Sequence, residues 1–399
     1  MKNLTLLILI CISSFTHANS NKLHLKDIVS IPDVSNAKLS PNGKHIAYLV
    51  KVDTKKNKGV LVMLHDIEKN TQIKLAYSEN KKYIVYSILW GSNNVLLMKA
   101  KFPLKTKGFD TTETVLLRTD INTRKVQRVI PKGLFDKMRW VSNILTNVID
   151  TLPHDDNYIL MSISGFIKGN GEAVIKIPIT DDYRYETVQR AKTDVVKWMT
   201  DVKNEVRIGI KLDETTYTII EKEASGDFRT LWEYEALSKD KIIPLGLDAD
   251  NKTLYLEALH EGKDAIYKVD LSDPTLEKTL VHFDGKYDVI NNIRRSKKTN
   301  EIVGAGSHYW DEPYKKFIES IDKALPDTNN YLLDFSVDGD TYIVLATNDN
   351  EPGIYIVGNR KKKSLEVFAY KYEKLSPEVL SKKQSISYKA RDGVIIEGY

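Results

Sequence analysis

The chain has 399 residues, of which 42% are hydrophobic and 28% charged, and its formal net charge is +5. This composition is that of a globular protein with enough apolar residues for a core, and it excludes a wholly disordered chain. The 59 basic and 54 acidic residues are nearly balanced. The densest basic runs, 55–58 and 360–363, fall where turns are expected, so we interpret them as solvated loop tips and expect no nucleic-acid partner.

The first 20 residues are predicted to be a secretory signal. Lys2 provides a positive start, and the apolar run 4–15 is shorter than the roughly 20 residues that a membrane-spanning helix needs. Residues 16–18 then place small side chains at the two positions that a signal peptidase reads. We therefore expect cleavage after Ala18 and an exported protein, periplasmic or secreted, with no stable membrane span. An uncleaved anchor is the alternative.

Cys11 is the sole cysteine and lies within this signal. The mature chain is therefore expected to have no disulfide, no thiol nucleophile and no thiolate metal site, and we expect no cofactor. The sequence His154-Asp155-Asp156 has no second histidine at a suitable spacing, so a structural loop is favoured over a metal site. The run 165–171 lacks the Gly-Lys-Ser/Thr ending of a phosphate-binding loop, and we expect a hairpin turn there.

A pair of segments recurs along the chain. The first member is a polar turn followed by an apolar strand, and the second is an apolar strand, a polar turn and another short strand. The first members begin 43 to 62 positions apart, near the roughly 40 to 50 residues of a four-stranded propeller blade. They begin at Ser40, Trp90, Leu152, Trp198, Gly246, Ile293 and Ser336. The second members begin at Leu61, Thr114, Ala173, Thr216, Asp264 and Gly353.

These segments predict an all-β, seven-bladed β-propeller over residues 19–375. The mixed apolar pattern of 46–50 is typical of strands that are buried on both faces between neighbouring blades. The repeat at Ile293 lacks a clear second member, and 308–326, which takes its place, is expected to be partly helical. A β-sandwich array is the alternative architecture. Three dipeptides that tolerate positive φ mark tight turns between strands: Asn42-Gly43, Asp250-Asn251 and Asp338-Gly339.

The last 25 residues differ from the repeats. LSPEVLSKKQ, from Leu375, is predicted to be an extended linker with a short helical turn. SISYKARDGVIIEGY, from Ser385, is predicted to form two strands that are joined at Asp392-Gly393.

The stretch IPDVSNAKLSPNGKHIAYLV, from Ile31, resembles the start of the propeller in serine peptidases of the prolyl oligopeptidase family. The bacterial dipeptidyl aminopeptidase and acylaminoacyl-peptidase branch is the most similar. The resemblance runs to Tyr399, and the ordered set of blade motifs that ends in YKARDG and EGY carries it. It implies that 376–399 are a linker and the first strands of a truncated α/β-hydrolase domain. In this family that domain holds a nucleophilic serine in a G-x-S-x-G elbow, followed by aspartate and histidine.

The sequence contains no G-x-S-x-G motif, and the nearest text, from Ser162, lies within the propeller repeats. No catalytic residue is therefore assigned, and the chain is expected to be inactive alone. The resemblance implies a non-catalytic, substrate-gating propeller of an exported serine peptidase that acts on short peptides. Its expected partners are a peptide substrate and a hydrolase domain that is missing or separately encoded. A stand-alone envelope propeller that binds proteins and a decayed remnant of a peptidase are the alternatives.

Asp311-Glu312 is a paired acid beside Tyr309 and Trp310. Some propellers of this family use a paired acid to bind a peptide amino terminus, but they place it differently. We interpret these two residues as part of a solvated loop.

Overall fold

The computed structural model describes residues 23–105, 108, 110–166, 170–182 and 184–398. The predicted signal sequence, its cleavage site at Ala18 and Cys11 lie outside these residues. Strands make up 51% of the described residues and helices 6%, which confirms the all-β class. Among the described residues, no helix is both long and apolar enough to cross a membrane.

The strands form small antiparallel sheets that follow one another in chain order, and we number these sheets 1 to 7. Sheet 1 contains β1 (Val34–Leu39), β2 (His45–Asp53), β3 (Lys58–Asp66) and β4 (Thr71–Glu79). Sheet 2 contains β5 (Ile84–Trp90), β6 (Val95–Lys105), β7 (Asp110–Asp120) and β8 (Val126–Arg128), with β9 (Ile144–Leu145) added in parallel to β7. Sheet 3 contains β10 (Val148–Asp150), β11 (Tyr158–Ile163), β12 (Ala173–Pro178) and β13 (Glu186–Gln189). Sheet 4 contains β14 (Val195–Thr200), β15 (Val206–Asp213), β16 (Thr216–Lys222) and β17 (Phe228–Glu235).

The second half of the chain continues this pattern. Sheet 5 contains β18 (Ile242–Leu247), β19 (Thr253–His260), β20 (Lys263–Asp270) and β21 (Thr279–His282). Sheet 6 has three strands, β22 (Ile293–Arg295), β23 (Ile302–Ala305) and β24 (His308–Tyr309), and helix α3 (Glu312–Ala324) follows it. Sheet 7 contains β25 (Asn329–Phe335), β26 (Thr341–Thr347), β27 (Ile354–Asn359) and β28 (Ser364–Tyr370). Two short helices, α1 (Leu25–Ile28) and α2 (Lys132–Phe135), and a hairpin of β29 (Ile386–Lys389) and β30 (Ile395–Gly398) complete the described elements.

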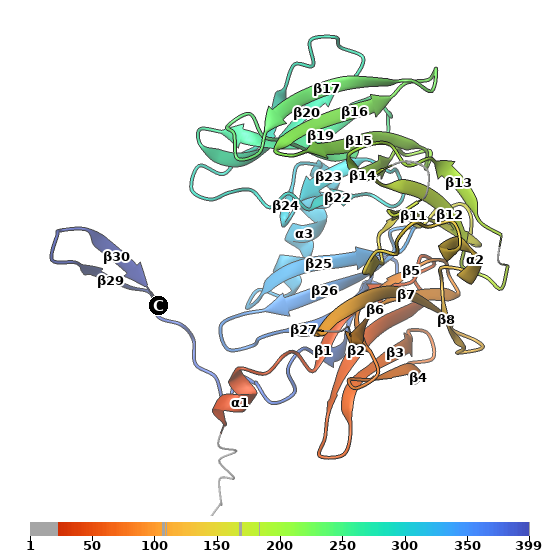
Figure 1. Cartoon of the computed structure of the whole chain (residues 1–399). Helices are drawn as coiled ribbons and strands as arrows, with labels where there is room; N and C mark the ends of the chain where they lie inside the picture. The colour runs from red at the N-terminus through yellow and green to blue at the C-terminus, as the bar shows by residue number, and fades with distance from the viewer. Residues whose placement is uncertain (1–22, 106–107, 109, 167–169, 183, 399) are drawn as a thin grey trace, which may run out of the picture.

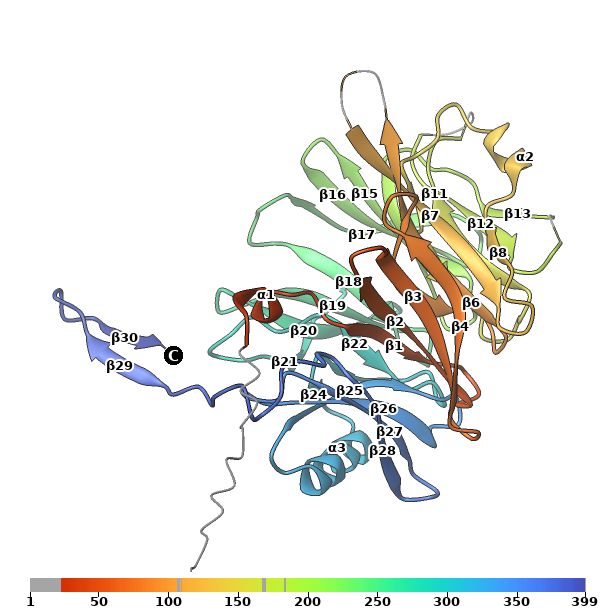
Figure 2. The ribbon, with the colours of Figure 1, turned by 90° about the horizontal axis from the view of Figure 1, so that it is seen from below.

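The sheets stand around a common axis, and the last sheet lies beside the first (Figures 1 and 2). The first strands of neighbouring sheets contact one another: β1 contacts β5 and β25, and β14 contacts β10 and β18. In these sheets the first strand is therefore the innermost, and the fourth is the outermost. This arrangement is that of a propeller-like fold.

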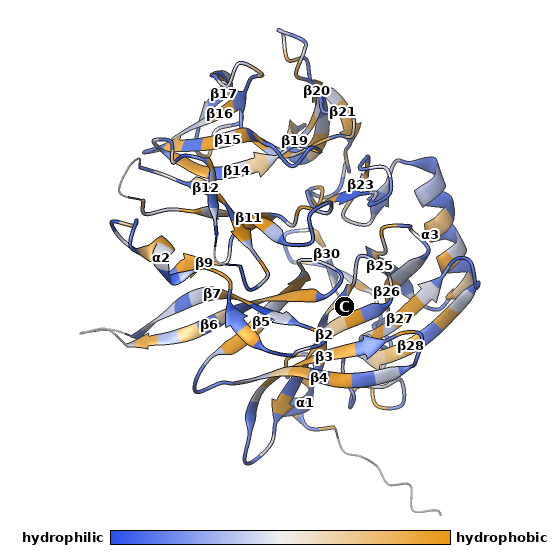
Figure 3. Cartoon of the chain, turned by 90° about the vertical axis from the view of Figure 1, so that its right-hand side faces the viewer, coloured by the Kyte–Doolittle hydropathy of each residue, from blue (hydrophilic) through white to orange (hydrophobic). Residues whose placement is uncertain are grey.

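Apolar side chains fill the space between successive sheets. The ribbon coloured by hydropathy shows that the connecting loops are mostly hydrophilic (Figure 3). Strand β2 shows how one strand serves two interfaces. Ile46 and Tyr48 pack toward sheet 7, whereas Ala47 and Leu49 pack toward sheet 2. Because successive side chains of a strand point to opposite faces, a strand between two sheets must be apolar on both. The predicted burial of 46–50 on both faces is confirmed.

The ring closes by face-to-face packing of sheet 7 on sheet 1. Leu39 and Ile46 share one buried cluster with Ile343 and Tyr355. Backbone hydrogen bonds also join sheets 7 and 1 at this contact, which we call the seam. Asp33 N donates to Lys371 O at 2.9 Å, and Val337 N donates to Pro41 O at 2.8 Å. Within the described residues, β1 pairs only with β2, so the closure uses no shared strand.

Helix α3 takes the place of a fourth strand in sheet 6 (Figure 1), as the helical character of 308–326 predicted. Its apolar face buries Phe317 and Ile321 between sheets 6 and 7. The prediction of a loop at Asp311-Glu312 is wrong, although Glu312 is exposed to solvent as expected. Asp311 is the N-cap, and its carboxylate accepts a hydrogen bond from Tyr314 N at 3.0 Å, while Glu312 is the first helical residue. An aspartate at this position satisfies a backbone N–H that the helix cannot.

The predicted turns form where local chemistry favours them. Gly43, Asn251 and Gly339 have φ values of 70°, 59° and 76°, as the turn dipeptides predicted. After Leu375 the chain makes a single turn at 376–380, and β29 and β30 then pair as a hairpin around Gly393. Both views of the ribbon show this hairpin extending away from the sheets (Figures 1 and 2).

Candidate functional site

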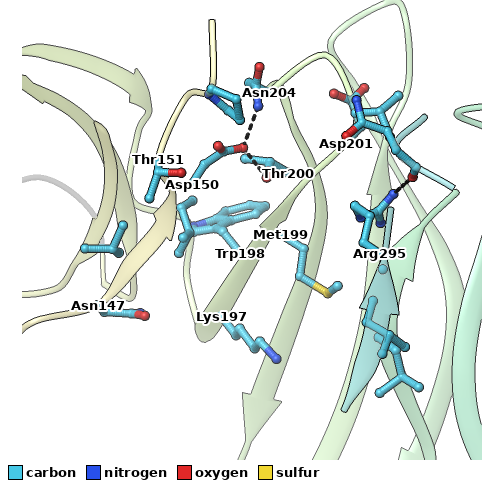
Figure 4. A pocket seen from close by; sticks show the side chains of 18 of the residues that line it. Asn147, Asp150, Thr151, Lys197, Trp198, Met199, Thr200, Asp201, Asn204 and Arg295 are labelled. Atoms are coloured by element: carbon cyan, nitrogen blue, oxygen red, sulfur yellow. Dashed lines mark hydrogen bonds between the residues drawn. The ribbon is translucent and has the colours of Figure 1, made fainter. Parts of the chain in front are cut away.

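A cavity of about 590 Å³ lies where the first strands of sheets 3 to 6 converge, and we call it the axial cavity (Figure 4). Its walls come from β10, β14, β18 and β22 and from the turns that follow three of these strands. Because the first strands are innermost, the residues at their ends meet at the axis although they are far apart in the sequence. The polar residues of its lining include Asn147, Asp150, His154, Lys197, Thr200, Asp201, Asn204, Arg295 and Asn300.

Asp150 joins two walls of the axial cavity. Its Oδ2 accepts hydrogen bonds from Thr200 Oγ1 at 2.8 Å and from Asn204 Nδ2 at 3.0 Å. Its Oδ1 accepts a hydrogen bond from Leu152 N at 2.8 Å. The carboxylate at the end of β10 therefore holds the turn that follows β14, and Figure 4 shows the two hydrogen bonds to Thr200 and Asn204.

Arg295 contributes a positive charge from β22. Its guanidinium donates hydrogen bonds to the carbonyl oxygens of Asn300 and Leu247. Burial lowers the pKa of Arg295, and the nearby carboxylates of Asp248 and Asp150 oppose this effect. The ordinary pKa of an arginine lies so far above neutrality that this side chain stays charged.

Asp201 has a structural role at the rim. This nearly buried carboxylate accepts Lys203 N at 2.9 Å and Glu205 N at 3.0 Å through Oδ1, and Asn251 Nδ2 at 2.9 Å through Oδ2. It thus shapes the turn after β14 and ties sheet 4 to sheet 5. Lys197, on β14, is exposed, and among the described residues it forms no ion pair.

The axial cavity therefore combines polar groups of both charge signs with an apolar wall from Trp198 and Met199. Such a lining can bind a polar, flexible ligand. Covalent catalysis would need a nucleophile within hydrogen-bond reach of a base. Among the described residues, no serine hydroxyl is hydrogen-bonded to a histidine ring. No set of three histidine, cysteine, aspartate or glutamate side chains in the described part of the chain is placed to hold a metal ion.

The residues that the sequence singled out lie in turns. Asp155 pairs with Lys176 Nζ at 2.8 Å, and the hydrogen bond from Lys176 lowers the pKa of this carboxyl. The segment 154–156 is thus a structural loop, as predicted. Ile163 pairs with Ala173, so 165–171 joins a hairpin, with 167–169 outside the described residues.

Sequence reasoning did not single out Asp150, Lys197 or Arg295. The signal that could have found them is their position in the repeat. Asp150 and Lys197 come just before the first members that begin at Leu152 and Trp198, and Arg295 comes just before the turn in its own repeat. In a propeller-like fold these positions form the inner ends of neighbouring sheets.

The two faces of the ring differ. The turns between first and second strands lie on one face, which we call the turn face, and hydrogen bonds such as Asn42 N to Asn93 Oδ1, at 2.9 Å, link neighbouring turns. Asp33 and Lys371, where the chain enters and leaves the ring, lie on the opposite face, which we call the terminal face. On this face the segment around α1 exposes four aliphatic side chains. They are Leu25, Ile28, Val29 and Ile31.

No protein-family model and no curated protein sequence matches the chain. The chain is similar to the solved structure of one of two prolyl endopeptidases analysed for inter-domain dynamics, with 11% identity and a TM-score of 0.53 over 92% of this chain and 54% of that one. It is similar to a puromycin-hydrolyzing peptidase of Mycobacterium tuberculosis, with 11% identity and a TM-score of 0.51 over 92% and 57% of the two chains. A third likeness is to prolyl oligopeptidase B of Galerina marginata, with 8% identity and a TM-score of 0.53 over 92% and 55%.

The chain spans about half the length of these solved structures. Identities near 10% show the fold alone. The chain therefore shares the propeller-like fold of structures that belong to peptidases of the prolyl oligopeptidase family.

Proposed function

We propose that the chain is the non-catalytic, seven-bladed propeller of an exported serine peptidase of the prolyl oligopeptidase type, and that it admits only short peptides to the active site. The catalytic residues would belong to an α/β-hydrolase domain outside these 399 residues. Each of the seven numbered sheets is then one blade, and sheet 6 is a blade in which α3 replaces the outer strand.

The observation that carries this proposal is the uncovered hairpin β29–β30. Ile386, Tyr388 and Ile396 share one of its faces, because Tyr388 pairs with Ile396 across the hairpin. Their exposed fractions are 53%, 56% and 39%. An apolar sheet face and two open strand edges in water favour association with another sheet. We infer that this hairpin joins the sheet of a hydrolase domain.

The terminal face supports the same partner. Its four exposed aliphatic side chains around α1 lie beside the segment that leads to the hairpin, since Lys374 Nζ pairs with Asp27 Oδ1 at 3.1 Å. The matched solved structures, which are peptidases, are nearly twice as long as the part that this chain covers. A second domain docked on the terminal face would cover both apolar surfaces.

The axial cavity supports the gating role. Its mixed charges would bind the polar backbone of a peptide without regard to one side chain. The ring is closed at the seam between sheets 7 and 1, so a folded protein could not enter through it. Only a flexible segment narrow enough for the axis would reach a domain on the terminal face.

The experiment begins with the DNA downstream of codon 399, where we expect a reading frame that encodes a G-x-S-x-G motif. Its product is co-expressed with the chain. We expect the two to copurify and to hydrolyse aminoacyl or peptidyl chromogenic substrates, with loss of activity on treatment with a serine-directed inhibitor. The chain alone is expected to show no such activity. Removing the propeller is expected to extend cleavage from short peptides to long unfolded chains.

A matched pair of variants tests the hairpin. Tyr388→Ser should abolish copurification, whereas Val367→Ser, at a similarly exposed position on β28, should not. Inhibitor-sensitive hydrolysis by the chain alone would refute the non-catalytic role. Copurification that is unaffected by Tyr388→Ser would refute the proposed docking of the hairpin.

A further inference from the structure

A second cavity, of about 320 Å³, lies next to the axial cavity, and Asn147 lines both. Its walls carry one positive and one negative side chain, Lys99 and Glu172, and we call it the Lys99–Glu172 cavity. It lies toward the terminal face, because Thr146 and Asn147 come just before β10, at the opposite end of that strand from its turn.

Lys99 lies on a face of β6 whose preceding residues are apolar and buried. On β6, Leu96, Met98 and Ala100 pack toward sheet 1, whereas Val95 and Leu97 pack toward sheet 3. Lys99 continues the second series, so its side chain leaves β6 toward sheet 3. It is half-buried, and burial lowers its pKa below the ordinary value for a lysine.

Glu172 lies just before β12 of sheet 3, and residues of sheet 4 hold its backbone in place. Its backbone N donates to Val195 O at 2.8 Å, and the indole Nε1 of Trp198 donates to its carbonyl oxygen at 2.8 Å. Its carboxylate accepts a hydrogen bond from Ser162 Oγ at 2.6 Å. Burial raises the pKa of Glu172, and the hydrogen bonds from Ser162 and Ser164 oppose this effect.

The two charges share one cavity without neutralising each other. Among the described residues, neither Lys99 nor Glu172 forms an ion pair, which requires nitrogen and oxygen atoms within 4.0 Å. A half-buried charge without a partner is destabilising, and one that gains a partner and hydrogen bonds is not. A ligand with a single charge would satisfy one group and leave the other unpaired.

We propose that the Lys99–Glu172 cavity binds a small zwitterion, an α-amino acid or a dipeptide. The Lys99 ammonium pairs with the ligand carboxylate, and the Glu172 carboxylate pairs with the ligand ammonium. Ser142, Thr146 and Asn147 supply further polar groups around the ligand. The volume is at the lower end of the roughly 300 to 1,000 Å³ of small-molecule sites, which suits a ligand of this size. The inference rests on the residues of the cavity and not on the proposed peptidase role.

Isothermal titration calorimetry of the purified chain with L-alanyl-L-alanine tests the proposal. Its N-acetyl and C-terminal amide derivatives each lack one charge, and each should bind at least about tenfold more weakly, because a charge-assisted hydrogen bond is lost. Above about pH 8, binding should also take up protons, because ion pairing favours the charged form of both the Lys99 amine and the ligand amine, whose ordinary pKa is about 8. The heat of binding would then differ between buffers of different ionisation enthalpy.

Matched variants place the site. Lys99→Met and Glu172→Gln should each weaken dipeptide binding by about tenfold or more. Lys101→Met, two residues along the same strand, and Glu186→Gln, on β13, are exposed controls and should leave it unchanged. The N-acetyl and amide derivatives of the dipeptide are tested on the chain without substitutions. The proposal therefore stays testable even if one of these variants fails to fold.

Equal binding of the dipeptide and both derivatives would overturn the proposal. So would retained binding in both cavity variants, or no detectable heat at ligand concentrations in the tens of millimolar. Each of these results leaves the proposed peptidase role standing, because that role is decided by copurification and hydrolysis.

Discussion

The closure of the ring at the seam between sheets 7 and 1 can be tested by removing one buried side chain. Ile343, on β26, has an exposed fraction of 0% and lies in the cluster that joins the two sheets. Ile343→Ala removes buried methyl groups and leaves a cavity, which should lower the free energy of unfolding by about 2 to 5 kcal/mol. Urea denaturation followed by tryptophan fluorescence measures this loss. With an m-value of about 3 kcal/mol/M, a loss of about 3 kcal/mol lowers the midpoint by roughly 1 M.

A double-mutant cycle shows whether the effect belongs to the seam. Ile46, on β2, is equally buried in the same cluster but belongs to sheet 1. The Ile46→Ala and Ile343→Ala substitutions should couple by about 0.5 to 3 kcal/mol, because the two side chains pack in one buried cluster. Ile266→Ala, in the cluster between sheets 5 and 6, is the control, and with Ile343→Ala it should be additive within about 0.5 kcal/mol. Additive Ile46 and Ile343 substitutions would show that sheets 7 and 1 do not pack as described.

Three further predictions concern other parts of the chain. Asp311→Ala should lower the free energy of unfolding by about 1 kcal/mol, because Tyr314 N loses its hydrogen-bond acceptor at the start of α3. The same urea assay measures this loss, and an unchanged midpoint would refute the capping role of Asp311. Burial lowers the pKa of His65 below the ordinary histidine value of 6.5. Near pH 6.5 this side chain therefore binds more protons in the unfolded chain than in the folded one. The free energy of unfolding should consequently fall as the pH drops through 6.5 toward 5. His65→Phe should reduce this slope, and an unchanged slope in that variant would contradict the assignment. N-terminal sequencing of the exported protein should begin at the residue after Ala18, and a retained first residue would refute cleavage.

Several features followed from local sequence chemistry. The strand-and-turn repeat was visible because strand propensity, apolar pattern and turn dipeptides such as Asp338-Gly339 act over a few residues. The hairpin around Gly393 and the helical character of 308–326 were visible for the same reason. The sequence also showed from 46–50 that strands would be buried on both faces. The loop assigned to Asp311 failed because a carboxylate that caps a helix and one that is solvated look alike until the helix is placed.

The candidate sites could not be predicted in this way. Asp150, Lys197 and Arg295 come from three different repeats and meet only because their strands are innermost. Lys99 looks like an ordinary charged residue in its strand, and its importance depends on the sheet that it faces. Glu172 reaches the same cavity from that sheet, held there by Trp198 of the next one.

The sequence alone determined that this chain would form repeated short strands with tight turns, since those preferences are local. Only the tertiary structure decided which ends of these strands meet at the axis, how the last sheet packs on the first, and which charges are left facing a shared cavity. The physical reason is that these outcomes depend on apolar clusters between sheets. Such clusters join residues that are distant in the sequence, and no short segment encodes them by itself.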